Sequence, residues 1–237
     1  MNLLLLEEQQ LQSDNCAMLS ERQQNHVQNV LRAEDGTQLK VGLLNGSVGT
    51  ALLHRQATHT SLRQVSFAYS APPQLPVTVI LALPRPQMIK RILQTIACMG
   101  VRKLVFIQTG KVEKSFWQSP SVTDSAIREQ LILGLEQAGA TQLPVIEKHT
   151  RLRPFVEDIL PSMLQNTTAL VAHPGNYPGC PQLGSDAPAL VAIGPEGGFT
   201  ENEVDWFHRA GFKPFQLGQR ILKVETAVPV ILARLYN

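Results

Sequence analysis

The sequence has few cysteines and places them far apart. Cys16, Cys98 and Cys180 form no CxxC pair, and none has a histidine at ligand spacing. This spacing argues against both a disulfide framework and a structural zinc site. We therefore expect a cytoplasmic protein with reduced thiols and no bound metal.

Long apolar runs are also absent. No run approaches the ~18 residues that a membrane helix needs. The opening stretch 1–6 has no basic flank and soon meets Glu7 and Glu8, so it does not resemble a secretion signal. We expect no membrane partner. At 237 residues, with 43% hydrophobic and 17% charged residues, the chain is long enough for one large or two small folded domains.

The first 70 residues have the pattern of a β-rich domain. The apolar runs 39–44 and 48–53 flank Asn45-Gly46-Ser47, and an Asn-Gly pair suits a tight hairpin. Val65, Phe67 and Tyr69 then alternate with polar residues, which predicts a strand with one buried face. Three prolines follow within 72–76 and stiffen the chain. We therefore predict one domain over 1–72 and a second over 73–237.

The second domain alternates apolar strands with amphipathic helices. Continuous apolar strands in this arrangement predict an α/β fold, with a mostly parallel sheet covered on both faces. The expected strands are 77–83, 103–107, 143–146, 169–172, 190–193 and 215–217. The expected helices run from Pro86 to Gly100, over 127–139, near Pro154, over 201–210 and from Thr226 onward.

Three loops follow the last three expected strands, at the sheet edge where α/β proteins bind ligands. The middle loop, 194–200, has three glycines in five residues, which exposes backbone groups to a flat ligand. Thr200 and Glu203 fit a capping box at the start of the next helix. The alternative is a turn that only starts this helix. The loop contains neither Gly-Lys-Ser/Thr nor GxGxxG, which excludes the common phosphate-binding motifs.

The loop after 217 places Arg220 and Glu225 before an apolar helix. We expect Thr226 to cap this helix and Pro229 to lie in its first turn. Arg220 and Glu225 are either catalytic or a salt bridge that holds the loop. The first loop begins with His173, which is more often structural than catalytic at a strand end. The final helix has more apolar side chains than one packing face needs, which predicts a homodimer: Val228, Val230, Ile231, Leu232 and Leu235.

Basic residues gather in two stretches, although the net charge is only +2. The first holds seven cations and one acid: Arg85, Lys90, Arg91, Arg102, Lys103, Lys111 and Lys114, with Glu113. The second comprises Arg209, Lys213, Arg220 and Lys223. Such stretches either bind phosphate or form a solvated surface.

At these loops the chain resembles the SPOUT (α/β-knot) methyltransferases, and within them the 16S ribosomal RNA uracil-N3 methyltransferase family. The matching residues are His173-Pro174, Ile193 through Phe199 with Glu203, and Leu217-Gly218 through Arg220-Ile221-Leu222 to Glu225-Thr226-Ala227. A weaker match covers Asn25-His26-Val27, Val30-Leu31-Arg32, Gly36 and Asn45-Gly46.

The resemblance implies a PUA-like β-barrel over 1–72 and a knotted domain over 73–237 that binds S-adenosylmethionine, in a homodimer that acts on RNA. The methyl group would pass directly to N3 of a uridine. The implied cofactor residues are His173, Pro174, Gly194, Pro195, Glu196, Gly197, Gly198, Leu217, Gly218, Ile221, Leu222, Thr226 and Ala227. Arg220 would bind the target base or a phosphate, and Glu225 or Glu196 would orient Arg220 or accept a proton. The expected RNA contacts are Arg32, Lys90, Arg91 and Lys223.

The chain departs from the family at several positions. Thr95, Cys98, Ala140 and Lys223 replace residues that are usual in the family, and the basic N-terminus is absent. Three alternatives stay open. The chain is a paralogue that methylates another RNA or position, an enzyme acting on a ribose 2′-hydroxyl, or an RNA-binding protein without catalysis.

Overall fold

The chain folds as two compact units. The structure is a computed structural model that describes residues 2–56 and 59–236. The first unit comprises Met1–Pro73 and Ile132–Leu143, and the second comprises Gln74–Leu131 and Pro144–Asn237. The first unit is therefore built from two separate stretches of the sequence.

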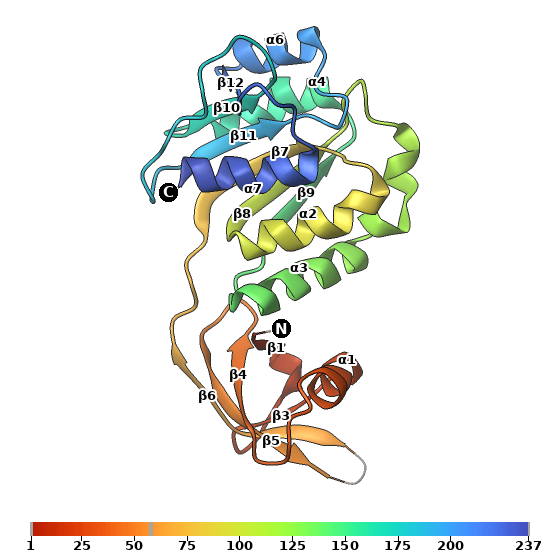
Figure 1. Ribbon diagram of the computed structural model, residues 1–237, viewed down its shortest axis with the longest axis vertical. Coiled ribbons are helices and arrows are strands. Elements are labelled where there is room, and N and C mark those ends of the chain that lie inside the picture. Colours follow the sequence, from red (N-terminus) through yellow and green to blue (C-terminus); the bar gives the residue numbers. More distant parts are fainter. Residues whose placement is uncertain (1, 57–58, 237) are drawn as a thin grey trace. The chain divides into compact units, whose positions relative to one another are not determined.

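The first unit contains a curled six-stranded sheet, whose strands β4, β5 and β6 can be followed in Figure 1. Its strand order is β1-β4-β5-β6-β3-β2, with β1 parallel to β4 and every other pair antiparallel. Its elements are β1 (Leu4–Leu6), η1 (Glu8–Gln10), β2 (Leu11–Gln12), β3 (Cys16–Met18), α1 (Glu21–Asn25), η2 (His26–Val30), β4 (Gln38–Leu43), β5 (Val48–Arg55) and β6 (Thr60–Tyr69).

The predicted hairpin is confirmed, because β4 and β5 are joined through Asn45, which has a φ of +60°. The expected strand through 65–69 is confirmed as part of β6, except for the burial of its last residue, whereas the all-β expectation was wrong for 21–30. Residues 21–30 are helical rather than extended, since Ser20 caps α1 and a π-helical turn, η2, continues it. The alternation in β6 also stops early. Val65 is buried, but Tyr69 is 67% exposed.

A buried carboxylate joins the two stretches of the first unit. Glu136 has a side-chain exposure of 0%, and both of its oxygens accept hydrogen bonds from the Arg22 guanidinium, at 2.7 and 2.9 Å. Its main-chain carbonyl accepts the N–H groups of Asn2 and Leu3. A buried carboxylate needs such partners, because an unpaired charge away from water is strongly destabilising. The start of the chain thus depends on residues more than a hundred positions away.

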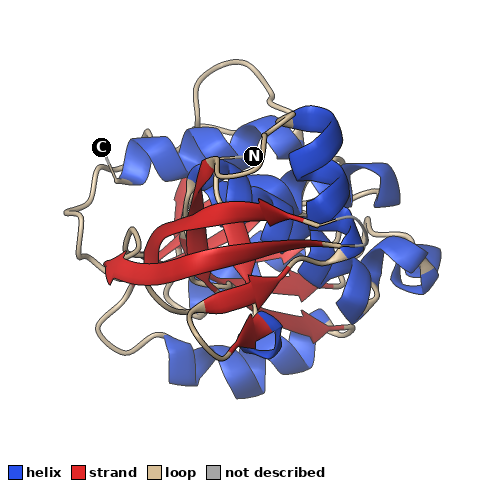
Figure 2. Cartoon of the chain, turned by 90° about the horizontal axis from the view of Figure 1, so that it is seen from below, coloured by secondary structure: helices blue, strands red, loops and turns tan. Residues whose placement is uncertain are grey.

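The second unit is built on a six-stranded, all-parallel sheet of order β12-β10-β11-β7-β8-β9. Helices lie over the strands of this sheet in Figure 1, and Figure 2 colours the helices and strands of the whole chain. This arrangement confirms the expected mostly parallel sheet. The remaining elements of the chain are β7 (Leu75–Ala82), α2 (Pro86–Cys98), β8 (Val101–Ile107), η3 (Lys114–Gln118), η4 (Pro120–Val122), α3 (Asp124–Ala138), β9 (Val145–His149), α4 (Leu152–Pro154), η5 (Phe155–Ile159), α5 (Leu160–Met163), β10 (Thr168–Ala172), β11 (Ala189–Ile193), α6 (Glu201–Arg209), β12 (Lys213–Phe215) and α7 (Val224–Leu235). All belong to the second unit except the second half of α3, which belongs to the first.

Most expected elements of this unit are confirmed, and the differences lie at element ends. Pro86 opens α2, whose apolar face is fully buried. Strand β12 ends at Phe215 rather than 217, and β9 begins at Val145 rather than 143. Over the described ranges, no helix is long and apolar enough to cross a membrane. Within those ranges, too, no three His, Cys, Asp or Glu side chains are grouped to hold a metal ion.

Candidate functional site

The candidate site lies where the order of the parallel strands changes direction. From β7 the chain builds outward through β8 and β9, and then returns to place β11 against the other side of β7. Loops that leave neighbouring strands toward opposite sides open a crevice at the carboxyl edge, which is where α/β sheets bind ligands. The sequence alone does not reveal this strand order. It therefore identified the carboxyl edge of the sheet as the site, but not the point along that edge where the strand order changes direction.

The loop after β11 is shaped by its glycines. Gly198 has a φ of +70°, and its N–H donates to the Pro195 carbonyl at 2.7 Å. A Cβ on Gly194 would lie 2.9 Å from the backbone nitrogen of Phe199, closer than side chains tolerate. Gly194 and Pro195 are buried, whereas Glu196 and Gly197 are exposed. The loop therefore presents its middle to solvent and keeps its ends in the core.

Glu203 ties this loop to the rest of the sheet edge. The predicted capping box is confirmed, since Thr200 accepts the Glu203 N–H and Glu203 Oε2 accepts the Thr200 N–H at 2.8 Å. The second oxygen, Oε1, accepts the N–H of Gly110 at 2.6 Å. Because Glu203 is only 5% exposed, water competes little for these bonds.

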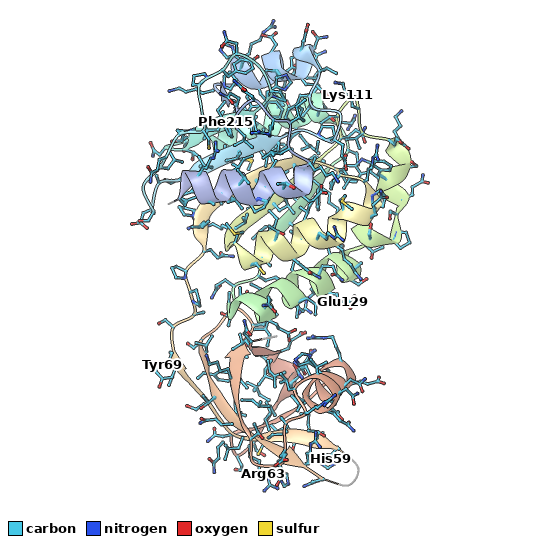
Figure 3. All side chains as sticks on the ribbon, viewed as in Figure 1. His59, Arg63, Tyr69, Lys111, Glu129 and Phe215 are labelled. Atoms are coloured by element: carbon cyan, nitrogen blue, oxygen red, sulfur yellow. The ribbon has the colours of Figure 1, made fainter. Side chains whose placement is uncertain are left out.

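The loops after β7 and β8 also reach the glycine loop. The Arg85 N–H donates to Glu196 Oε1 at 3.1 Å. The Lys111 ammonium, labelled in Figure 3, donates to the Gly197 carbonyl at 2.8 Å. Reasoning from the sequence missed Lys111 and Gly110 as site residues. Ligands bind at the carboxyl ends of parallel strands, and we applied this rule only to the last three strands. Applied to β8 as well, it would have identified both residues.

The loop after β12 is open and lightly bonded. Gly218 has a φ of +123°, and its N–H donates to the Gln216 side chain. Ile221 is 82% exposed, which is unusual for a large apolar side chain. Arg220 is exposed and Glu225 is half-buried. Among the ion pairs of the described residues, none joins these two, so the salt-bridge alternative is not what holds the loop.

The start of α7 differs from the expectation. Thr226 does not cap the helix, which begins at Val224 after Lys223. The Lys223 carbonyl accepts the N–H groups of Thr226 and Ala227, at 3.0 and 2.8 Å, so both lie within the first turn. Pro229 lies inside the helix, beyond the first turn, and therefore removes one donor from the hydrogen-bond ladder.

His173 is half-buried at the end of β10. Its main-chain N–H donates to the Phe215 carbonyl at 3.0 Å, which joins the first and third loops. Its Nδ1 atom is buried, and no group in the described part of the chain bonds to it. Burial, and after it the positive charge of Lys111, lower the pKa of the His173 imidazole. The ring is therefore neutral at neutral pH, with one nitrogen available to a ligand.

The expected RNA-binding cations lie on exposed surfaces. Lys90 and Arg91 are exposed on α2, and Lys223 is exposed at the start of α7. Pro174 is exposed beside His173. Arg32 is exposed in the first unit, with a φ of +50° just after η2. The structure thus brings the three predicted loops and the loop after β8 to one edge of the second unit.

This arrangement suits a polar organic ligand with a flat ring. Exposed backbone groups and glycines accept a ring at close approach, and a neutral imidazole adds a polar contact. Arg220 and Lys111 provide positive charge at the same edge, which suits an anionic second substrate.

Comparison with known proteins agrees on one family. Residues 71–236 match the model of a family described as RNA methyltransferase domain. The ribosomal RNA small subunit methyltransferase E of Treponema pallidum is 31% identical over 236 residues, covering 96% of this chain and 87% of that protein. The protein of the same name from Synechocystis is 32% identical, covering 92% of this chain and 71% of its own length.

A solved structure has the same fold. It is the ribosomal RNA small subunit methyltransferase E of Neisseria gonorrhoeae, bound to S-adenosyl methionine. The two chains are 21% identical and align with a TM-score of 0.74, over 98% of this chain and 95% of the other.

We predict that Glu203→Gln destabilises the second unit. The amide offers one acceptor and turns a donor toward an N–H, so one buried hydrogen bond is lost. The expected cost is about 2 kcal/mol, or a fall of roughly 5 °C in Tm, measured by thermal unfolding. The matched control is Glu201→Gln, an exposed carboxylate in the first turn of the same helix, which should cost under about 1 kcal/mol. Equal losses in the two variants would contradict the bridging role of Glu203.

Proposed function

The chain belongs to the RNA methyltransferase family, and we propose that it methylates N3 of a uridine in 16S ribosomal RNA with S-adenosylmethionine as the methyl donor. The observation that carries the proposal is the 31% identity with the Treponema pallidum ribosomal RNA methyltransferase over almost the whole chain. The family match over 71–236 includes every loop of the candidate site. We also propose a cytoplasmic location, in keeping with three cysteines that form no disulfide.

The open loops fit S-adenosylmethionine. The backbone N–H groups of Ile221 and Leu222 have no hydrogen-bond partner within the described residues, and Ile221 offers apolar surface beside them. An adenine ring needs this combination of polar edge and apolar face. When bound, the cofactor supplies a methyl group made electrophilic by its sulfonium. The residues we assign to its binding are His173, Pro174, Gly194, Pro195, Glu196, Gly197, Gly198, Leu217, Gly218, Ile221, Leu222, Thr226 and Ala227.

The target base requires a positive group and a proton acceptor. Uracil N3 carries a proton and takes part in base pairing, so the base must be unpaired and must lose that proton. Arg220 is exposed and makes no ion pair among the described residues, so its planar fork is available to the base or to a phosphate. Glu196 already accepts the Arg85 N–H, whereas Glu225 accepts no hydrogen bond in the described chain. This difference favours Glu225 as the proton acceptor.

The finer fold assignments are part of the proposal. We take the second unit as an α/β-knot, in which the last segment of the chain passes through the loop 173–188. Hydrogen bonds from both ends of that segment support this: Gln216 donates to Pro178, and Leu235 accepts from Leu183. We take the sheet of the first unit as a PUA-like barrel that binds RNA.

The surface cations Lys90, Arg91, Lys223 and Arg32 are our candidates for phosphate contacts. All four are exposed, which a phosphate contact requires. Lys90 and Arg91 share α2 with Thr95 and Cys98, two of the departures from the family pattern. Because these departures change the surface that faces solvent on α2, a second candidate function is the same chemistry on a different RNA or position.

We expect the chain to act as a homodimer. The apolar residues of α7 support this expectation less than the sequence suggested. Four of its five noted apolar residues are buried within the second unit, and Val230 is half-buried. Ile221 is 82% exposed, more than the other exposed large apolar side chains of the described residues, and we take it as the candidate dimer contact. We predict a dimer by light scattering at micromolar concentration, and Ile221→Lys should shift it toward monomer. The matched control is Val145→Lys, at an exposed apolar residue on β9. A monomeric wild type would refute the dimer.

We predict that the purified protein methylates 16S ribosomal RNA from cells that lack the gene, and that nucleoside mass analysis then finds 3-methyluridine. Arg220→Lys loses the two parallel donors, so kcat/KM should fall roughly 10- to 100-fold while cofactor affinity stays unchanged. Arg209→Lys, at an exposed arginine on α6, is the control and should leave kcat/KM unchanged. A methylated ribose or another base would instead favour the second candidate function. Absence of any methylation in RNA would overturn both.

We predict that Lys90→Gln with Arg91→Gln weakens RNA binding across sequences. Each phosphate contact contributes about 0.7 to 0.9 to the salt slope, so the slope should flatten by roughly one to two units. Filter binding over a range of salt concentrations measures it. Arg151→Gln with Arg153→Gln removes the same charge from other exposed positions and should not change the slope. Wild-type salt dependence in the α2 variant would make its cations a solvated surface only.

A further inference from the structure

The turn after β8 holds two aromatic side chains that the proposed reaction does not use. Phe116 and Trp117 lie in η3, and both are half-buried. The chain has only two tryptophans, and the other, Trp206, lies on α6. An aromatic ring with a face near solvent, at the edge of a site for RNA, is a candidate for base stacking.

The indole of Trp117 is fixed by a chain of hydrogen bonds. Its Nε1–H donates to Gln108 Oε1 at 2.6 Å. The Gln108 amide in turn donates to the Thr109 and Val112 carbonyls, at 2.7 and 2.8 Å. The Gln108 backbone N–H donates to the His149 carbonyl at 2.9 Å, which extends the β8–β9 pairing. The ring is thus oriented before any ligand binds, so stacking on it orders no further side chain.

The same turn connects Trp117 with the candidate site. Gly110 donates to Glu203, and Lys111 donates to the Gly197 carbonyl, so the turn is held against the glycine loop. Lys111 and Lys114 are exposed, and the ammonium of Lys111 has three N–H donors, of which one is used at Gly197. An aromatic ring on the same turn as two exposed cations matches the way proteins hold single-stranded nucleic acid, by stacking on bases and pairing with phosphates.

We propose that Trp117 is a stacking platform for an unpaired base beside the target nucleotide, with Lys111 and Lys114 on the neighbouring phosphates. The inference rests on the proposed function and deepens it by assigning how the single-stranded RNA is held. Stacking tolerates any base, because every base has a π-face. Trp117 therefore holds the RNA strand in position at the site and does not select its base sequence.

Fluorescence tests the contact without turnover. In a Trp206→Phe background Trp117 is the only indole, and a single-stranded oligouridine should quench its emission on titration, with no cofactor present. In the reverse variant, Trp117→Phe, emission from Trp206 should stay unchanged under the same titration. Absence of quenching in the Trp206→Phe protein would overturn the proposal, whether or not the wild type methylates RNA.

Kinetics provide a second test. Trp117→Leu should raise the KM for RNA about ten- to a hundredfold, with kcat and cofactor affinity close to wild type. Trp117→Phe retains a ring and should recover most of the loss. If Trp117→Leu does not fold, a wild-type KM for Trp117→Phe with undiminished quenching in the Trp206→Phe protein still supports stacking. A wild-type KM in a folded Trp117→Leu overturns it. If the wild type methylates no RNA, only the proposed function is refuted, because the quenching test of Trp117 does not depend on turnover.

Discussion

The buried carboxylate of Glu203 is the group on which the candidate site depends. One oxygen completes the cap of α6, and the other holds the turn after β8. Lys111, the next residue of that turn, donates to the Gly197 carbonyl in the middle of the glycine loop. The loop is therefore fixed at its helical end and at its middle, while its own glycines leave the backbone open. Preorganisation of this kind lets loop backbone serve as a binding surface without a large ordering cost on binding.

The sequence allowed the local parts of this arrangement to be predicted. The capping box of Thr200 and Glu203, the start of α2 at Pro86 and the Asn45 turn follow from contacts over a few residues, and all three are confirmed. The bond from Gly110 to Glu203 joins residues 93 positions apart. No local pattern predicts such a pair, because it depends on which strands become neighbours. The expected cap at Thr226 was wrong because the helix begins earlier in the chain. The Lys223 carbonyl accepts the Thr226 N–H, so Thr226 lies inside the first turn.

The first unit shows the same limit more strongly. Its N-terminal strand is held by the main chain and side chain of Glu136, and the Thr141 hydroxyl donates to the Gly46 carbonyl in the hairpin turn. The residues 132–143 that supply these contacts begin inside α3, and the periodicity of this helix gives no sign that its second half belongs to another unit. Helix 21–30 was missed because its apolar residues are too few for a 3.6-residue period, and its cap at Ser20 is the one local sign.

The two units differ in net charge, and this difference affects how each of them can bind RNA. The first unit has five lysine and arginine side chains against seven carboxylates, and one of the five, Arg22, is paired with Glu136. The second unit has sixteen against twelve. Long-range attraction of a polyanion must therefore come from the unit that has the glycine loop. A contribution of the first unit to RNA binding has to rest on short-range contacts, such as those of Arg32 and the exposed Val30 and Leu31 near it. Apolar contacts of Val30 and Leu31 depend little on salt, whereas phosphate contacts, including the one proposed for Arg32, weaken steeply as salt rises.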